Sequence, residues 1–191
     1  EVVCDACVEL SATMTGALIV LERQTRLGEQ IDNGTILNAD PSKELFGNIF
    51  YNKTPLHDGA VIMRDGKILA AACFLPKPQK EELVNKKLGS RHRAAIGMSE
   101  NSDAVVIVVS EETGAISVAE NGVLKSGFTR ESLHQLLTSR LIASGEETTI
   151  GKVAKKLPFL KRHQKNSGKE KEHAKESVEK PAEKDITEEP E

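Results

Sequence analysis

The sequence has few aromatic residues. Its 191 residues include no tryptophan, one tyrosine and five phenylalanines. Proteins that bind single-stranded nucleic acid without sequence preference stack successive bases on aromatic side chains, so this composition argues against such a surface. The formal net charge of −3 gives no overall attraction to DNA, RNA or an anionic membrane. Any anion site must therefore be local, and no nucleic-acid partner is expected.

Cysteine is also scarce. The three cysteines, Cys4, Cys7 and Cys73, are an odd number and indicate no disulfide framework, which favours a reducing cytoplasm. Cys4 and Cys7 have the C-x-x-C spacing of redox and zinc sites. They lie at the start of a predicted helix, with no preceding strand and no second cysteine pair. We therefore expect no redox or zinc function for them.

The sequence lacks a long hydrophobic run. No stretch reaches the roughly 18 apolar residues that a membrane span needs, and no signal peptide is evident. The chain begins with Glu1 rather than methionine. A preceding segment, such as a membrane anchor, would therefore not be visible in this sequence.

Large apolar residues are rare at the C-terminal end. From Lys161 to Glu191 the sequence consists mainly of Lys, Glu, His, Ser and Pro, with charges that nearly cancel. Such a segment cannot bury enough apolar surface to offset the entropy lost on ordering. We therefore predict one domain over residues 1–160 and a charged, disordered tail over residues 161–191.

The remaining sequence mixes helical and strand patterns. Apolar residues recur at helical spacing over residues 1–14 and after Asp40-Pro41-Ser42, where Pro41 is expected in the first turn of a helix. Thr129 is expected to cap a helix with Leu133, Leu136, Leu137 and Leu141 on one face, and a further helix is predicted from Ser90 to Ser99. Short apolar runs predict strands at residues 17–21, 60–63, 68–74, 104–109 and 115–119. Asp65-Gly66 predicts a hairpin turn, and residues 76–87 a long loop or short helix. The pattern indicates an α/β fold, with a central mixed β-sheet surrounded by helices in a single domain.

A polar sequence lies where a loop becomes the strand at 60–63. His57 and Asp58 are ionisable, and Gly59 and Ala60 leave room for a ligand to approach the backbone. An aspartate here could bind a divalent metal or accept a proton from a hydroxyl group. An ordinary Asp-Gly turn is one alternative. A phosphohydrolase of the HD type is another, disfavoured because the dipeptide leads into a strand and no partner ligands are evident.

Basic side chains stand at the start of the helix that follows Gly89. Ser90 is followed directly by Arg91, His92 and Arg93. The positive end of a helix dipole disfavours basic residues unless an anion compensates, and its free N–H groups attract phosphate. Arginine also offers planar, multidentate donors to phosphate oxygens. The pattern favours a polyphosphate site, with an exposed basic turn or carboxylate-paired arginines as the alternative.

Two further segments could take part in a site. Glu111 and Glu112 follow the strand at 104–109, where carboxylates could bind Mg²⁺ or Mn²⁺, although an ordinary acidic turn has the same composition. Phe74 and Leu75 follow the second strand of the hairpin. Phe74 could stack on a base, although a phenylalanine in such a place is more often a core residue.

In this order and spacing, the motifs resemble those of the diadenylate cyclase (DAC) family. The resemblance covers about residues 1–130 and rests on Gly16–Val20, Thr54–Ala60, Ala70–Pro76, Leu88–Ala95 and Val108–Gly114. It implies the DAC-type fold. The most similar subgroup is the membrane-anchored cyclic di-AMP synthases. That subgroup implies a bacterial protein with an anchor before the domain and a catalytic domain that faces the cytoplasm.

The resemblance implies an enzyme that condenses two ATP molecules into cyclic di-3′,5′-AMP and two pyrophosphates. One domain would hold one ATP, so two domains would face one another as a homodimer. The cofactor would be Mg²⁺ or Mn²⁺, and regulatory proteins are further candidate partners.

The same resemblance implies a role for each site residue. Asp58 would be the catalytic residue that helps to activate the 3′-hydroxyl group, and His57 with Glu111 or Glu112 would bind the metal. The ATP-binding residues would be Gly59, Ala60, Phe74, Leu75, Ser90, Arg91, His92 and Arg93.

Two residues depart from the family pattern. Ser90 stands where the family commonly has threonine, which keeps a hydroxyl group. Phe74 stands where relatives often have tyrosine, so stacking is kept but a contact through a phenol hydroxyl is lost.

Two other classes of function stay open. The domain could bind a nucleotide as a regulatory module without turnover, although Asp58 together with the basic helix start favours catalysis. It could also be an assembly domain, which gives no reason for Arg91 and Arg93 at a helix start.

Overall fold

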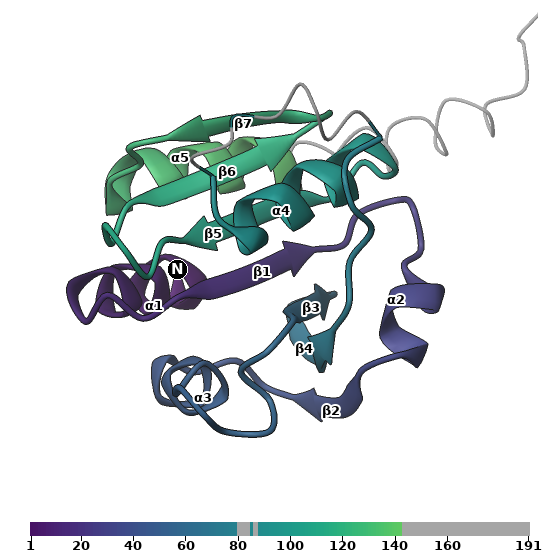
Figure 1. Cartoon of the computed structure of the whole chain (residues 1–191), viewed down its shortest axis with the longest axis horizontal. Helices are drawn as coiled ribbons and strands as arrows, with labels where there is room; N and C mark the ends of the chain where they lie inside the picture. Colours follow the sequence, from purple (N-terminus) through teal and green to yellow (C-terminus); the bar gives the residue numbers. More distant parts are fainter. Residues whose placement is uncertain (80–84, 86–87, 143–191) are drawn as a thin grey trace, which may run out of the picture. The chain divides into compact units, whose positions relative to one another are not determined.

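A seven-stranded β-sheet forms the centre of the described residues, which are 1–79, 85 and 88–142 of the computed structural model. Its strands are β1 (Ala17–Leu21), β2 (Thr35–Ala39), β3 (Ala60–Arg64), β4 (Lys67–Cys73), β5 (Val105–Val109), β6 (Ile116–Glu120) and β7 (Val123–Ser126). The helices are α1 (Val2–Ala12), α2 (Gly28–Asp32), α3 (Lys43–Ile49), α4 (Ser90–Glu100) and α5 (Arg130–Leu141) (Figure 1).

The sheet is mixed, as predicted. Its strand order is β2-β4-β3-β1-β5-β6-β7. The central pair β1 and β3 is parallel, and every other neighbouring pair is antiparallel. A parallel pair needs a crossover connection. The segment between β1 and β3 provides it and carries α2, β2 and α3.

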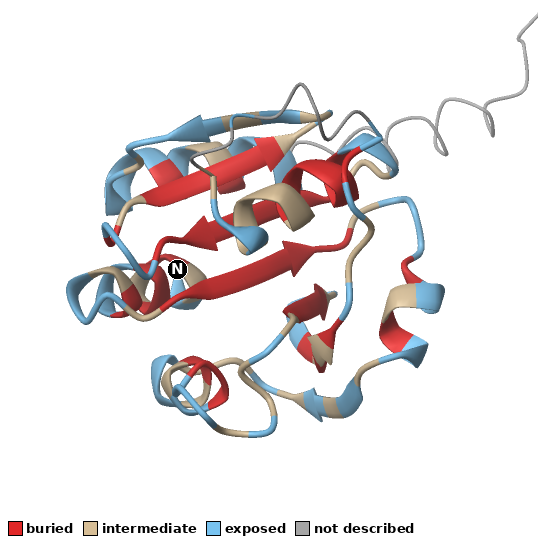
Figure 2. Cartoon of the chain, in the orientation of Figure 1, coloured by how far each residue is buried: buried red, intermediate tan, exposed pale blue. Residues whose placement is uncertain are grey.

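Alternate residues of the central strands enter two separate cores. On β1, Ala17, Ile19 and Leu21 lie in a cluster with residues of α1, α3 and α5. Leu18 and Val20 lie in a second cluster with residues of α2 and α4. Because helices cover both faces, β1 and β5 are buried along their whole length (Figure 2). This burial explains why both read as continuous apolar runs.

The predicted hairpin is confirmed. β3 and β4 pair antiparallel, and Asp65 and Gly66 connect them with φ angles of 50° and 80°. Positive φ at both central residues is what a two-residue turn of type I′ requires, and Asp-Gly provides it at little cost.

Helix α5 begins where it was predicted. Thr129 is the N-cap and forms a capping box with Ser132. Leu133 and Leu137 are buried against the core with α1, whereas Leu141, also expected on the apolar face, is exposed. The last turn of the helix therefore extends past the core.

Three elements did not follow from the sequence pattern. β2 and β7 are the outer strands of the sheet, and α2 has five residues. All residues of both outer strands are exposed or half-buried, so neither has the buried apolar run that indicates a strand. The start of α3 also differs. Ser42 is its N-cap and accepts from the Leu45 N–H at 3.1 Å, so Pro41 precedes the helix instead of lying in its first turn.

The three cysteines are core residues. Cys4 and Cys7 lie on the buried side of α1, and no disulfide joins the cysteines of the chain. Burial raises the pKa of Cys7 to about 12 and that of Cys73 to about 11. Both thiols are therefore protonated at neutral pH and unreactive.

The predicted boundary at residue 160 and the tail at 161–191 lie outside the described residues, as does part of the loop predicted at 76–87. Within the described ranges, no helix combines the length and the hydrophobicity needed to cross a lipid bilayer.

Candidate functional site

The loop between α3 and β3 selects one tautomer of His57. The His57 side chain is half-buried, and its Nδ1 lies 2.6 Å from the Thr54 carbonyl oxygen. A carbonyl oxygen can only accept, so Nδ1 carries the proton of the neutral ring. Nε2 then presents a lone pair, which is the form in which a histidine binds a metal ion.

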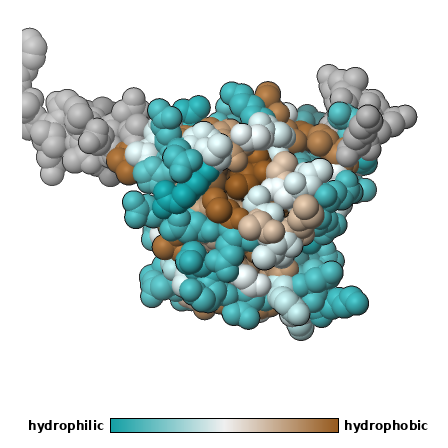
Figure 3. All heavy atoms as spheres, turned by 90° about the vertical axis from the view of Figure 1, so that its left-hand side faces the viewer, coloured by the Kyte–Doolittle hydropathy of each residue, from teal (hydrophilic) through white to brown (hydrophobic). Residues whose placement is uncertain are grey.

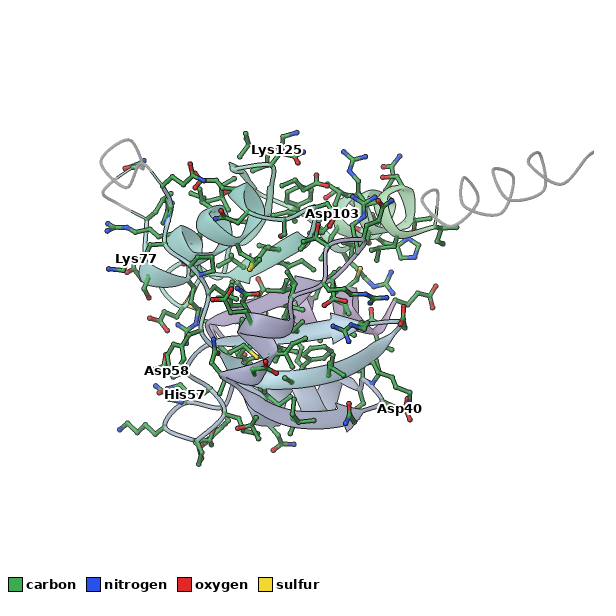
Figure 4. The ribbon with its side chains drawn as sticks, turned by 90° about the vertical axis from the view of Figure 1, so that its right-hand side faces the viewer. Asp40, His57, Asp58, Lys77, Asp103 and Lys125 are labelled. Carbon is green, nitrogen blue, oxygen red and sulfur yellow. The ribbon has the colours of Figure 1, made fainter. Side chains whose placement is uncertain are left out.

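The next three residues lie in different environments. Asp58 is exposed and lies beside His57 (Figure 4). Gly59 has a φ of 111°, and a Cβ atom there would lie 2.7 Å from the carbonyl carbon of Ala72. This glycine therefore lets the chain enter β3 close to the backbone of β4. Ala60 is fully buried, so only its backbone could approach a nucleotide.

The first turn of α4 is open to an anion. The helix begins at Ser90, as predicted, and its N-cap Gly89 has no side chain that could accept from the first N–H groups. Ser90 is exposed, and Arg91, His92 and Arg93 are partly buried. The turn therefore combines free backbone donors with basic side chains.

Ser110 shapes the acidic turn after β5. Its Oγ accepts hydrogen bonds from the backbone N–H groups of Glu112 and Thr113, each at 3.3 Å. Gly114 completes the turn with a φ of 69°. Glu111 and Glu112 are thereby exposed at the carboxyl end of the strand.

An ion pair joins the start of α4 to this acidic turn. Arg91 Nη1 donates to Glu111 Oε2 at 2.7 Å, and the two side chains are 20% and 63% exposed. Gly16, just before β1, lies against both: a Cβ atom there would lie 2.7 Å from Arg91 Nη1 and 2.8 Å from Glu111 Oε2. Arg91 Nε is buried and has no hydrogen-bond partner among the described residues. The guanidinium group therefore keeps donors for a ligand.

Residues of three of the four predicted segments meet in a cleft. A cavity of about 1040 Å³ is lined by His57, Arg91 and Glu111, together with residues at the end of α1 and in the loop after α3. A smaller cavity of about 200 Å³ shares Arg91 and Glu111 with it and is also lined by Ser90, His92 and Glu112. Figure 3 views the side of the molecule on which β1 begins and β5 ends, where a hydrophobic hollow is surrounded by hydrophilic atoms.

The other predicted site residues do not line these two cavities: Asp58, Gly59, Ala60, Phe74, Leu75 and Arg93. Asp58 is nevertheless next to His57, which does line the cleft. Arg93 Nε donates to the Leu88 carbonyl oxygen at 3.1 Å, which holds its side chain against the segment before α4.

Phe74 is not a core residue. Its side chain is 64% exposed, so that interpretation is wrong. Asn33 Oδ1 accepts from the Phe74 backbone N–H at 2.8 Å and so fixes the backbone at the end of β4. Leu75 is half-buried and packs against the core beneath α2 and α4. The exposed ring is free to stack on a planar ligand.

Burial changes the charge of His92. It lowers the pKa of the imidazole below its usual value of 6.5, and the Glu112 carboxylate opposes this effect only in part. His92 is therefore neutral at pH 7 and can donate one hydrogen bond.

The predicted metal ligands do not form a closed site. The described ranges contain no group of three or more His, Cys, Asp or Glu side chains arranged to hold a metal ion. His57 and Glu111 both line the larger cavity, but Glu111 Oε2 already accepts a hydrogen bond from Arg91. An imidazole nitrogen and a carboxylate oxygen suit a divalent cation. Such a cation would need additional ligands from substrate or water.

Three residues that build the site were given no role from the sequence: Gly16, Asn33 and Thr54. Gly16 and Thr54 entered only as parts of motifs that resemble the DAC family, although a glycine directly before a buried strand can also indicate close packing. Thr54 acts through its backbone carbonyl and Asn33 through a contact with a distant residue. Neither effect leaves a pattern in the sequence.

A comparison with protein families identifies the domain. The model of the DAC family, described as "DisA bacterial checkpoint controller nucleotide-binding", matches residues 4–124, which is more than half of the chain. The chain belongs to the DAC family. This result confirms the family that the motifs predicted, and every predicted site residue lies within the matched segment.

Several DAC relatives have names or solved structures. The protein named "Cyclic di-AMP synthase CdaA" from Bacillus subtilis (strain 168) is 48% identical over 134 residues, which are 70% of this chain and 49% of the relative. The chain thus spans about half the length of the first curated relatives that it matches.

Solved structures confirm the fold. A double-cysteine variant of DacA from Staphylococcus aureus has a TM-score of 0.70 and 42% identity, covering 72% of this chain and 91% of that one. A hypothetical membrane-spanning protein from Bacillus cereus has a TM-score of 0.63 and 50% identity, covering 65% and 61%. The mixed α/β sheet is therefore the fold of the DAC domain.

Proposed function

We propose that the chain is the catalytic domain of a diadenylate cyclase, which condenses two ATP molecules into cyclic di-3′,5′-AMP and two pyrophosphates. Membership of the DAC family and similarity to proteins named diadenylate cyclase and cyclic di-AMP synthase support this function. The observation that carries it is the convergence of Arg91, His57 and Glu111 in one cleft. A phosphate-binding cation beside metal-binding groups is what nucleotidyl transfer requires.

The start of α4 is assigned to the triphosphate. Its free N–H groups and partial positive charge attract phosphate, and Arg91 adds a guanidinium group with unused donors. Ser90 donates its hydroxyl group, and neutral His92 donates one hydrogen bond. Arg93 contributes a second guanidinium group to the triphosphate, and its side chain is already oriented by the hydrogen bond to the Leu88 carbonyl oxygen.

Asp58 is assigned to the proton transfer. The ribose 3′-oxygen of one ATP bonds to the α-phosphorus of the other, and the bond from that phosphorus to the pyrophosphate oxygen breaks. The exposed Asp58 carboxylate accepts the proton of the 3′-hydroxyl group. The step occurs twice, which closes the ring and releases two pyrophosphates.

Two domains face one another as a homodimer in this reaction. A single cleft holds one ATP, and twofold symmetry brings a second, identical cleft opposite it. Catalysis then depends on holding the 3′-hydroxyl group in line with the leaving pyrophosphate and on stabilising the charge that develops.

His57 and either Glu111 or Glu112 would hold the divalent cation, Mg²⁺ or Mn²⁺. The hydrogen bond from Nδ1 to Thr54 supports this role, because it leaves Nε2 of His57 as a ligand. When bound, the cation neutralises phosphate charge.

The adenine is assigned to Phe74 and Leu75, an exposed ring beside a half-buried aliphatic side chain. An aromatic ring stacks on any base, so stacking on Phe74 does not distinguish adenine from guanine. That discrimination must come from hydrogen bonds. Gly59 and the backbone of Ala60 are assigned to the approach of the nucleotide to the start of β3.

The parent protein is proposed to be anchored in a bacterial cell membrane with this domain facing the cytoplasm. The similarity to a hypothetical membrane-spanning protein supports an anchor outside the described residues. Regulatory protein partners are part of this proposal, and no nucleic-acid partner is.

The direct test is incubation of the chain with ATP and Mg²⁺ or Mn²⁺, followed by mass spectrometry of the nucleotides. Cyclic di-AMP and pyrophosphate in a ratio of one to two support the proposal. ATP binding without any product would make the chain a nucleotide-binding module, and no binding would leave only an assembly domain.

Arg93→Ala tests the phosphate site. We expect weaker ATP binding by about 1.5–3 kcal/mol, the contribution of a hydrogen bond to a charged group. Calorimetric titration with ATP measures it, and an unchanged affinity would count against the assignment of Arg93.

A further inference from the structure

The contact between Gly16, Arg91 and Glu111 is one that only a glycine permits. The position where any other residue would carry its Cβ atom lies 2.7 Å from Arg91 Nη1 and 2.8 Å from Glu111 Oε2. Both distances are shorter than van der Waals contact allows. The backbone before β1 therefore forms one wall of the space in which the ion pair lies.

The ion pair contributes little to the stability of the fold. Glu111 is 63% exposed, and ion pairs with an exposed partner contribute little because water and salt screen them. The Arg91 side chain is only 20% exposed and lines the cleft. A long side chain held in one conformation loses less entropy when it binds a ligand, so the benefit of the contact lies in binding.

We propose that Gly16 and Glu111 are positioning residues that hold the Arg91 guanidinium group in the cleft for the triphosphate of ATP. The inference rests on the proposed function and names two residues through which the phosphate site is prepared. Glu111 orients Arg91 through Nη1, and the accessible donors that remain on the guanidinium group are left for phosphate. Gly16 acts by the absence of a side chain.

Gly16→Ala tests this inference with a minimal change. The methyl group must displace the ends of two flexible side chains, so the fold should remain intact while Arg91 moves. We expect the KM for ATP and the calorimetric dissociation constant to rise roughly tenfold, as for a lost charge-assisted hydrogen bond. The kcat should change far less, because the contact acts equally on bound substrate and transition state.

Gly28→Ala is the matched control. It adds the same methyl group at a glycine on α2 that does not line the cleft. Apart from its chain neighbours and the backbone of its own helix, no atom lies within 4 Å of the Cβ position there. Its kinetic constants should equal those of the unmodified chain. Thermal unfolding of both variants shows whether either change affects the fold.

A double-mutant cycle tests whether Gly16 acts through Arg91. In an Arg91→Ala background, Gly16→Ala should have no further effect on ATP affinity, because the group that it displaces is gone. A tenfold loss in both backgrounds would overturn the inference, as would unchanged ATP affinity in Gly16→Ala alone.

Glu111→Gln separates positioning from metal binding. A positioning role predicts weaker ATP binding in the absence of metal, coupled to Arg91 in the same type of cycle. If the variant changes only the metal concentration needed for half-maximal activity, Glu111 acts as a metal ligand without positioning Arg91, and the inference is wrong for it. Calorimetry also separates this inference from the proposed function: if the unmodified chain makes no cyclic di-AMP, the proposed function fails, while the ATP affinities still decide the roles of Gly16 and Glu111.

Discussion

His57 and Asp58 are neighbours in the chain, yet the structure gives them different surroundings. The Thr54 carbonyl fixes the His57 ring from one side and leaves Nε2 for the cleft. The Asp58 side chain is exposed. A metal ligand needs a fixed orientation, whereas a proton acceptor needs access to the hydroxyl group that it serves.

Asp58→Asn should lose product formation by at least about a hundredfold while ATP binding persists, because the amide is nearly isosteric but cannot accept the proton. Mass spectrometry measures the product and calorimetry the binding. Asp65→Asn is the matched control, since it makes the same change in the β3–β4 turn, where asparagine also tolerates positive φ. Normal turnover by the Asp58 variant would rule out its catalytic role.

His92 predicts a pH dependence of stability. Its pKa is lowered in the folded chain, mainly by burial, whereas the unfolded chain has the usual value of 6.5. Below that pH the unfolded state binds a proton more readily than the folded state does. His92 therefore does not reduce the free energy of unfolding above about pH 7, but reduces it progressively as the pH falls.

His92→Gln should therefore reduce the loss of stability on acidification. Urea unfolding at a series of pH values from neutral to mildly acidic measures the free energy of unfolding of both chains. The difference between the two slopes isolates His92 from other titrating groups. Parallel curves would show that burial does not shift this histidine.

On the scale of elements, α4 connects the residues proposed to bind phosphate with those proposed to bind adenine. Its first turn carries Arg91 and His92, and its later turn packs on the segment that continues from Phe74 and Leu75. Gly97 makes this packing possible, because its missing side chain would overlap the Pro76 carbonyl oxygen and approach Pro78 N to 2.7 Å. The residues proposed for phosphate and those proposed for adenine are thus placed relative to one another by one helix.

Gly97→Ala should destabilise the domain by about 1–3 kcal/mol, because the opposing atoms are backbone and cannot rotate away. Gly47→Ala, within α3, is the contrasting variant. Apart from its chain neighbours and the backbone of its own helix, no atom lies within 4 Å of its Cβ position, so alanine should stabilise the helix by about 0.5–1 kcal/mol. Urea denaturation measures both, and a loss of similar size in both variants would contradict the packing argument.

On the scale of the whole molecule, the sheet order decides which loops meet. β1 lies between β3 and β5, parallel to one and antiparallel to the other. The start of β1 therefore lies beside the start of β3 and the end of β5. Gly16, the loop with His57 and the turn with Glu111 come together there, although they are far apart in the sequence.

The proposed homodimer predicts that activity depends on protein concentration. If two domains must meet, the rate of cyclic di-AMP formation per molecule should increase with concentration until the pair is saturated. Initial rates measured over a wide dilution series, with light scattering on the same samples, test this expectation. A constant rate per molecule in samples that contain only monomer would exclude the face-to-face mechanism.

The central strands, the hairpin and the starts of α4 and α5 could be predicted because their causes are local. Burial on both faces produces a continuous apolar run, Asp-Gly suits a tight turn, and Thr129 provides a capping oxygen. The outer strands β2 and β7 could not be predicted in this way, since their exposed side chains follow no pattern and their hydrogen bonds come from a neighbouring strand.

The candidate residues of the site could also be selected from the sequence, because basic groups at a helix start are unfavourable without an anion and because the ordered motifs resemble those of the DAC family. Their relationships depend on the fold. The pairing of Arg91 with Glu111 against Gly16, the tautomer of His57 and the exposure of Phe74 all arise from contacts between distant segments or from burial. A local sequence pattern carries no information on contacts between distant segments or on burial, since both are set by how the sheet and helices pack.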